Sequence, residues 1–275
     1  MIFRSALIAG MFCTAVLAQW PKYPTPGVPR TADGKPDLTA PTPRTSDGHP
    51  DFTGNWEYYR ERTAPPPVPT GASTGLGPVT PNTSPFFNIG VGLKEAIPFT
   101  PWAVELRKSR AAANNKDNPD AHCLPIGLTQ FHMHPQPRKI VQTPNLIVII
   151  YESNSGLRQI FMDGRPLPKN DPQPWWYGYS VGHWDGDTLV VETIGFRDDV
   201  WLDVEGSPLT GTGKITERMR RINFGNMETE VTIEDPKAYT KPWTVKFNHK
   251  IMLDEELIEF ICGENEKDAP HLVAK

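Results

Sequence analysis

The clearest pattern of apolar and polar positions lies in residues 178–196, GYSVGHWDGDTLVVETIGF. It predicts two strands, 179–184 and 187–196, joined by a two-residue loop, Asp185-Gly186, as in a type I′ hairpin. This register sets Tyr179 opposite Glu192. Side chains alternate along a strand, so the hairpin has two faces: Tyr179, Val181, His183, Thr188, Val190 and Glu192 on the first, and Ser180, Gly182, Trp184, Leu189, Val191 and Thr193 on the second.

The first face is apolar in its middle and polar at both ends, which is typical of a sheet that lines a ligand. The second face has the composition of ordinary core. The pattern leaves open which of the two faces lies inside the fold.

Short strands separated by turns account for much of the remaining chain. They are predicted at residues 54–59, 139–141, 146–152, 157–162, 214–223, 227–234, 243–252 and 257–262. About eight to ten antiparallel strands indicate a barrel or a sandwich. A barrel is favoured because a polar-ended face needs a closed interior to point into. The predicted fold class is therefore all-β, a lipocalin-like antiparallel β-barrel, and residues 54–275 form its single domain.

A proline-rich arm, residues 19–53, precedes this domain, and residues 20–85 contain 15 of the 30 prolines. The arm holds a repeat, RTADGKPDLT at 30–39 and RTSDGHPDFT at 44–53. Each copy predicts a tight turn that presents Leu38 or Phe52 to a surface, so we interpret the arm as wrapping the body. Calcium binding is the alternative, although two carboxylates per repeat fall short of the six to eight oxygens that this ion prefers.

One helix is predicted, at residues 101–113. Thr100 can cap its N-terminus, Pro101 suits the first helical position, and Asn114-Asn115 ends it.

The first 18 residues have the pattern of a secretory signal peptide. Arg4 precedes an apolar run that is too short to span a bilayer, and the small or apolar residues Val16-Leu17-Ala18 precede Gln19. We therefore expect a periplasmic or extracellular protein without a transmembrane segment. The formal net charge is −4 and no basic stripe is visible, so nucleic acid is not an expected partner.

Removal of the signal peptide leaves two cysteines, Cys123 and Cys262. In an oxidising compartment two such cysteines usually pair, so we predict a disulfide. Two buried free thiols or thiolate metal ligands are the alternatives. A thiolate zinc cluster would need a second cysteine pair, which the chain lacks.

The chain also resembles a large family of secreted bacterial proteins with no established activity. The resemblance covers most of residues 50–265 but implies no catalytic residue. Its motifs are Pro50-Asp51-Phe52-Thr53-Gly54-x-Trp56, Cys123-Leu124-Pro125-x-Gly127, Gln142-Thr143-Pro144, Arg158-x-Ile160-x-x-Asp163-Gly164-Arg165, the hairpin 178–196, Trp201-Leu202-Asp203, Glu217-Arg218, Asp235-Pro236-Lys237-Ala238-Tyr239, Pro242-Trp243 and Cys262-x-Glu264-Asn265. Separately, Gly54-x-Trp56 is similar to the opening of lipocalin-type barrels.

Two histidines, His132 and His134, form the most chemically suggestive motif. On a strand they would point to one face and could bind one metal ion, with His183 as a third ligand. Arg138, four residues further on, would repel a cation, so no metal site is predicted. The alternatives are a half-buried polar edge or a general base that works without metal.

A second candidate site lies on the first face of the hairpin. Tyr179, His183 and Glu192 could perform acid–base chemistry there if that face is internal. If it faces solvent, no special role follows.

A third candidate site combines an arginine–aspartate cluster with aromatic residues. Arg158, Asp163 and Arg165 surround a predicted turn and indicate a salt-bridge network or an anion or carbohydrate site. Trp175, Trp176, Tyr177 and Trp201 are either stacking surfaces for a ligand or core at the open end of the barrel.

Together these patterns favour an exported protein that binds a small hydrophobic or aromatic molecule, and no cofactor is predicted. The first alternative is a periplasmic hydrolase, lyase or isomerase that uses the histidine, tyrosine and glutamate groups. The second is a cell-envelope interaction protein that docks a partner through its arm.

Overall fold

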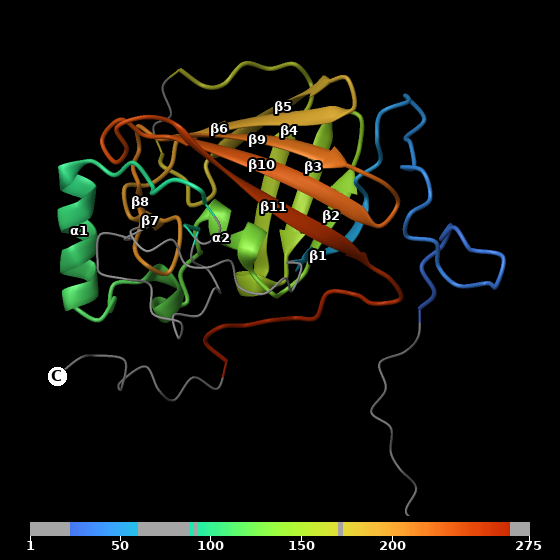
Figure 1. The fold of residues 1–275 in the computed structure, drawn as a ribbon, viewed down its shortest axis with the longest axis horizontal. Helices are drawn as coiled ribbons and strands as arrows, with labels where there is room; N and C mark the ends of the chain where they lie inside the picture. The colour runs from blue at the N-terminus through green and yellow to red at the C-terminus, as the bar shows by residue number, and fades with distance from the viewer. Residues whose placement is uncertain (1–22, 60–88, 91–92, 170–172, 265–275) are drawn as a thin grey trace, which may run out of the picture.

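The computed structural model describes residues 23–59, 89–90, 93–169 and 173–264. Nine strands close into a barrel in the order β1-β11-β10-β9-β6-β5-β4-β3-β2 (Figure 1). These strands are β1 (Gly54–Tyr59), β2 (Arg138–Gln142), β3 (Leu146–Tyr151), β4 (Gly156–Phe161), β5 (Tyr179–Asp185), β6 (Thr188–Ile194), β9 (Lys214–Arg221), β10 (Asn226–Glu234) and β11 (Trp243–Met252). The predicted all-β barrel is confirmed, whereas its likeness to lipocalins stays a prediction.

One pair of neighbouring strands departs from the predicted antiparallel arrangement. β4 and β5 run parallel over two residue pairs, Ile160 with Ser180 and Phe161 with Val181. A parallel pair needs a crossover rather than a tight turn, and the chain between Phe161 and Tyr179 supplies that connection.

The barrel closes through its first and last strands. β1 pairs with β2 on one side and with β11 on the other, where Asn55 faces Met252. The predicted strand at 257–262 is wrong, because β11 already has β1 and β10 as its two neighbours and offers no free edge. The chain after β11 instead runs back along the barrel as an irregular segment, held by a hydrogen bond from the Ile258 amide to the Glu152 carboxylate.

The central hairpin forms with a different register from the predicted one. Asp185 pairs with Thr188, so the loop is Gly186-Asp187, and Glu192 faces Val181 rather than Tyr179. Only Gly186 of this loop has a positive φ, +58°, as a type II′ turn requires at its first central position. The shift moves each partner by two residues, so the two predicted faces keep their members.

The second face of this hairpin lies inside. Ser180, Leu189, Val191 and Thr193 are buried, whereas His183 on the first face is exposed. The same alternation continues in β9, where Ile215 and Glu217 are buried.

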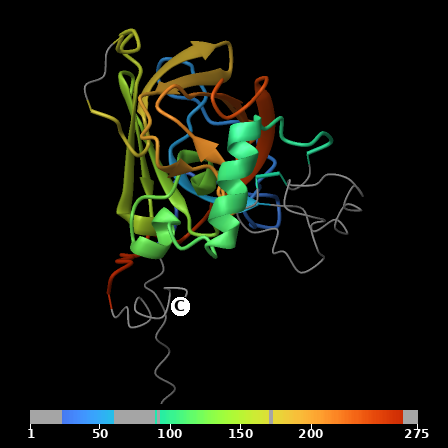
Figure 2. The ribbon, with the colours of Figure 1, turned by 90° about the vertical axis from the view of Figure 1, so that its left-hand side faces the viewer.

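Helices close one end of the barrel (Figures 1 and 2). Thr100 caps the N-terminus of α1 (Pro101–Ala112), as the sequence predicts: its hydroxyl accepts a hydrogen bond from the Ala103 amide. A second helix, α2 (Leu128–Met133), was not predicted, and all six of its residues are buried. Its Leu128 and Met133 share an apolar cluster with Ala103 of α1 and with barrel residues such as Val231. The remaining elements at this end are a 3₁₀ turn, η1 (Pro119–His122), and a small sheet of β7 (Val200–Trp201) and β8 (Pro208–Leu209).

The arm lies at the opposite end of the barrel, and its two repeats fold alike. Arg30 donates to the Gly34 carbonyl, as Arg44 does to that of Gly48. The second repeat docks on the β5–β6 turn: Arg44 forms two hydrogen bonds with Asp187, at 2.8 and 2.6 Å. Beside them the rings of His49 and Trp184 stack with their centroids 4.5 Å apart. The first repeat attaches to the β9–β10 turn instead, where the Leu38 carbonyl accepts a hydrogen bond from Gly225.

Cys123 and Cys262 form the predicted disulfide, with their Cα atoms 5.4 Å apart. It ties the chain after η1 to the irregular C-terminal segment. The predicted signal peptide, residues 1–18, lies outside the described residues. Within the described part of the chain, each helix is too short or too polar to cross a membrane.

Candidate functional site

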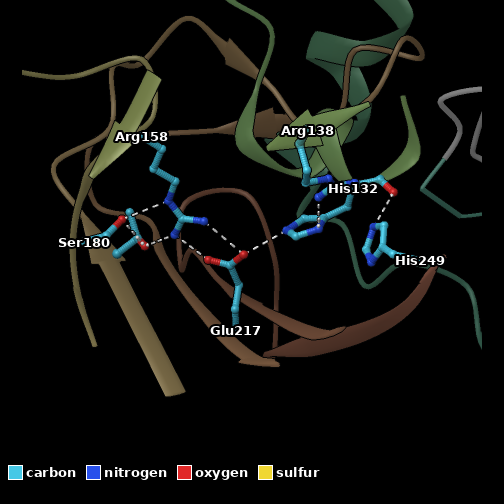
Figure 3. Close-up of polar contacts among 7 residues, drawn as sticks. His132, Arg138, Arg158, Ser180, Glu217 and His249 are labelled. Carbon is cyan, nitrogen blue, oxygen red and sulfur yellow. Dashed lines mark hydrogen bonds and ion pairs between the residues drawn. The ribbon is translucent and has the colours of Figure 1, made fainter. Parts of the chain in front are cut away.

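A network of charged side chains occupies the barrel interior (Figure 3). Arg158 of β4 binds the carboxylate of Glu217 of β9 through both terminal nitrogens. Its Nε donates to the Ser180 hydroxyl at 3.1 Å and its Nη2 to the Thr193 hydroxyl at 2.9 Å. Arg158 and Glu217 are 2% and 0% exposed, so this ion pair is shielded from solvent on every side.

The network continues through His132 of α2, whose two ring nitrogens both have partners. Arg138 of β2 lies 3.0 Å from Nδ1, and a guanidinium can only donate, so Nδ1 is the acceptor. The proton of the neutral ring is therefore on Nε2, which donates to Glu217 at 2.8 Å. His249 of β11 lies beside this pair and donates from its Nε2 to the His132 carbonyl at 3.2 Å.

Burial sets the protonation of these groups. Burial lowers the pKa of His132 in spite of its bond to Glu217, and it lowers the pKa of His249 well below the ordinary value. Burial alone would raise the pKa of Glu217, but the charge of Arg158 and the hydrogen bond from His132 outweigh it and hold this pKa far below its usual range. Burial also lowers the pKa of Arg138 to about 10, so this residue is still protonated at neutral pH.

This geometry favours a structural role for the His132–Glu217 pair over acid–base catalysis. A general base must reach the proton that it abstracts. His132 is 1% exposed, and its partners already occupy both ring nitrogens.

His134 lies apart from His132, because the two residues belong to a helix end and not to a strand. It is the C-terminal cap of α2, and its Nε2 lies 3.5 Å from the Ser153 hydroxyl. The two histidines therefore do not lie on one strand face, as the binding of a common metal ion would require. Among the described residues, no group of three or more histidine, cysteine, aspartate or glutamate side chains has an arrangement suited to a metal ion.

Tyr179, His183 and Glu192 are on the outer face of the barrel wall. Glu192 is paired with Lys214, and the Tyr179 hydroxyl accepts a hydrogen bond from Arg165 at 3.1 Å. The structure does not bring these three groups together around an enclosed space.

The predicted arginine–aspartate cluster is divided between the two faces of the wall. Arg158 points into the barrel, whereas Arg165 and Asp163 form an ion pair outside it at 2.6 Å. The Arg165 guanidinium also stacks on Phe161, 3.9 Å from the ring centroid.

Two of the four candidate aromatic residues meet in a pocket beside α1. The pocket has a volume of about 320 Å³, and Trp176 and Trp201 belong to its wall. Its other lining residues are Leu106, Ser109, Arg110, Asp117, Pro119, Leu124 and Asp199. Trp175 lies outside it and is 48% exposed, and Tyr177 packs against Phe131, with ring centroids 5.2 Å apart.

Arginines hold both pocket tryptophans in place. The Arg110 guanidinium lies 4.5 Å from the centroid of the Trp201 ring and donates to the Gly206 carbonyl at 2.7 Å. Burial lowers the pKa of Arg110 to about 10. Arg197 covers Trp176 in the same way, at 4.6 Å. α2 also supports the pocket wall, because the Gln130 side chain donates a hydrogen bond to the Trp201 carbonyl at 2.9 Å.

Most residues of the interior charge network and of the pocket beside α1 were not predicted from the sequence. Glu217 had a detectable signal, because in the strand KITERMRR it occupies an inward position between Ile215 and Met219. Leu106, Ser109 and Arg110 are spaced as one face of a helix, but only the fold reveals that Trp176 and Trp201 lie opposite them.

No protein-family model, curated protein or solved structure matches the chain. The resemblance to a secreted bacterial family therefore stays a prediction.

Proposed function

We propose that the protein binds a small aromatic or hydrophobic molecule in the pocket beside α1. The observation that carries the proposal is the convergence of Trp176 and Trp201, from either side of the central hairpin, on one cavity of about 320 Å³. Ligand pockets typically span about 300–1,000 Å³ and are lined mainly by apolar and aromatic side chains. This cavity is at the small end of that range, which favours a compact ligand of one or two rings.

The wall chemistry supports an aromatic ligand that carries hydrogen-bond donors. Leu106, Leu124 and the two tryptophans offer apolar contact, while Asp117 and Asp199 supply carboxylate acceptors. The guanidinium groups stacked on the indoles fix the ring orientations before a ligand arrives. Such preorganisation lowers the entropic cost of binding.

The proposed site is beside the barrel instead of inside it. Many inward-facing side chains belong to two apolar clusters or to the buried charge network, so we place the aromatic or hydrophobic ligand at the helical end. The disulfide supports our expectation of an oxidising compartment, periplasmic or extracellular.

Adjacent tryptophans provide a matched test. A panel of compact aromatic compounds would be screened by thermal shift, and hits would be titrated by intrinsic fluorescence. Trp176→Ala should weaken binding roughly tenfold or more, a loss of at least about 1.4 kcal/mol. Trp175→Ala, which changes a neighbouring ring outside the pocket, should leave the affinity unchanged.

Leu124→Glu tests the same wall at a rim position that is 43% exposed, where folding is little affected. It should also abolish binding of an uncharged aromatic ligand. Unchanged affinity in both Trp176→Ala and Leu124→Glu would move the binding site elsewhere.

A further inference from the structure

The strongest unexplained feature of the interior is the guanidinium of Arg138. It is 1% exposed and points into the barrel from the start of β2. Its Nη1 binds His132, but its Nε and Nη2 have no hydrogen-bond partner among the described residues. Buried donors without a partner are uncommon and costly, so two on one charged group call for a missing acceptor.

The charges around Arg138 do not balance. Glu217 has a single negative charge, and Arg158 already binds both of its oxygens. Burial raises the pKa of Tyr151, so the phenol that flanks Arg138 is neutral and supplies no counter-charge. His132 and His249 are neutral as well. Among the described residues, one positive charge therefore remains without a counter-charge in a shielded interior, where an unpaired ion is strongly destabilising.

The free edge of Arg138 has a specific shape. Nε and Nη2 are adjacent nitrogens whose N–H bonds point the same way, and this pair matches the two oxygens of a carboxylate. Arg158 shows what a satisfied guanidinium looks like in the same barrel, because its Nε, Nη1 and Nη2 all have partners. The contrast indicates that none of the described residues supplies the acceptor for Arg138.

We propose that a small planar carboxylate or oxyanion, of about the size of formate, binds the Nε–Nη2 edge of Arg138 inside the barrel. Its charge balances that of Arg138, and its two oxygens accept one hydrogen bond from Nε and one from Nη2. This site is separate from the pocket beside α1, and the proposal does not depend on the function assigned to that pocket.

Thermal unfolding of the full chain tests the proposal. Sodium formate, nitrate and chloride would be compared at millimolar concentrations and equal ionic strength, where general salt effects are small. A ligand of the native state raises the midpoint as its concentration increases. We expect formate and nitrate, which are planar oxyanions, to raise the unfolding midpoint progressively, and chloride to raise it less at every concentration.

Two arginine variants locate the effect. Arg138→Met should remove the difference between formate and chloride. Arg221→Met is the matched control, because Arg221 is also buried but donates to the carbonyls of Asp51 and Phe224. This control should keep the formate effect.

Equal midpoints in formate, nitrate and chloride would overturn the proposal and assign the free donors to water. Persistence of the formate effect in Arg138→Met would overturn it as well. If Arg138→Met does not fold, ¹³C-formate NMR on the unchanged protein decides: a bound signal that nitrate displaces and chloride does not supports the site, and the lack of such a signal contradicts it.

Discussion

In the barrel interior charged side chains are sealed from water, whereas in the pocket beside α1 they stay in contact with it. Glu217 is 0% exposed, while the side chain of Asp199 in the pocket is 53% exposed, although both carboxylates have partners on each of their oxygens. Both regions combine arginine, acid and aromatic rings. The difference between the two regions therefore lies in the depth of burial and not in the type of residue.

The largest expected effect comes from removing the acid at the centre of the interior network. Glu217→Gln leaves the buried Arg158 without its negative partner, so it should destabilise the protein by about 3–5 kcal/mol. Glu192→Gln is the matched control on the same barrel wall, where the pair with Lys214 is partly exposed and should contribute less than about 1 kcal/mol. Denaturant unfolding measures both, and equal losses would contradict the contrast between interior and surface.

Reduction of the disulfide should have the next largest effect, on the pocket side of the comparison. The bond joins residues 139 positions apart, and loss of such a cross-link typically costs about 2–4 kcal/mol. Because Cys123 precedes Leu124 of the pocket wall, ligand affinity should fall together with stability. Unfolding and titration with and without reductant measure the two effects, and the double variant Cys123→Ala/Cys262→Ala should be insensitive to reductant. Unchanged stability after reduction would contradict the prediction.

Acid should destabilise the protein through its buried histidines. The pKa values of His132 and His249 are lower in the folded protein than the ordinary value of 6.5, so below that pH the unfolded chain binds more protons and stability falls as pH decreases. Each histidine should contribute about 1.4 kcal/mol per pH unit. Glu217 has the same sign in a lower window: its stabilising effect is complete above about pH 4.5 and is lost as the pH falls toward its depressed folded pKa.

Denaturant midpoints at pH 7, 6 and 5 check this dependence. His249→Gln should reduce the pH dependence of the free energy of unfolding by the contribution of one histidine, about 1.4 kcal/mol per pH unit. If the stability of the unchanged protein did not depend on pH in this range, the buried rings would not be neutral.

The smallest stability effect is expected at the pocket rim. Leu124→Glu should change the free energy of unfolding by no more than about 0.5 kcal/mol, because surface substitutions away from special features have small effects. A loss comparable to that of Glu217→Gln would show that the pocket wall is part of the core.

Much of the barrel could be predicted because alternation and turn residues are local signals. β10 and β11 follow the predicted bounds closely, and the N-cap of α1 is readable from Thr100-Pro101. The hairpin register was wrong because one glycine suits two turn types, and only the structure shows that Gly186 comes first in the loop.

The sites were harder to predict because long-range contacts determine them. The histidine motif belongs to a helix end and not to a strand, and the burial of all six residues of that helix leaves no amphipathic pattern to detect. The sequence around Arg158 gives no indication that its partner is Glu217, which is 59 residues away. Trp176 could be named as a ligand residue from aromatic density, but not separated from Trp175 until the fold placed one inside the pocket and the other outside.

The pairing of β1 with β11 has a consequence for how the chain folds. The ring is completed only when residue 55 meets residue 252, so closure must wait for the last strand. Contacts of such long range slow folding. A fragment that ends before β11 would have two unpaired strand edges, on β1 and β10, and such edges promote aggregation. Only a chain that includes β11 can therefore close the barrel and remove both edges.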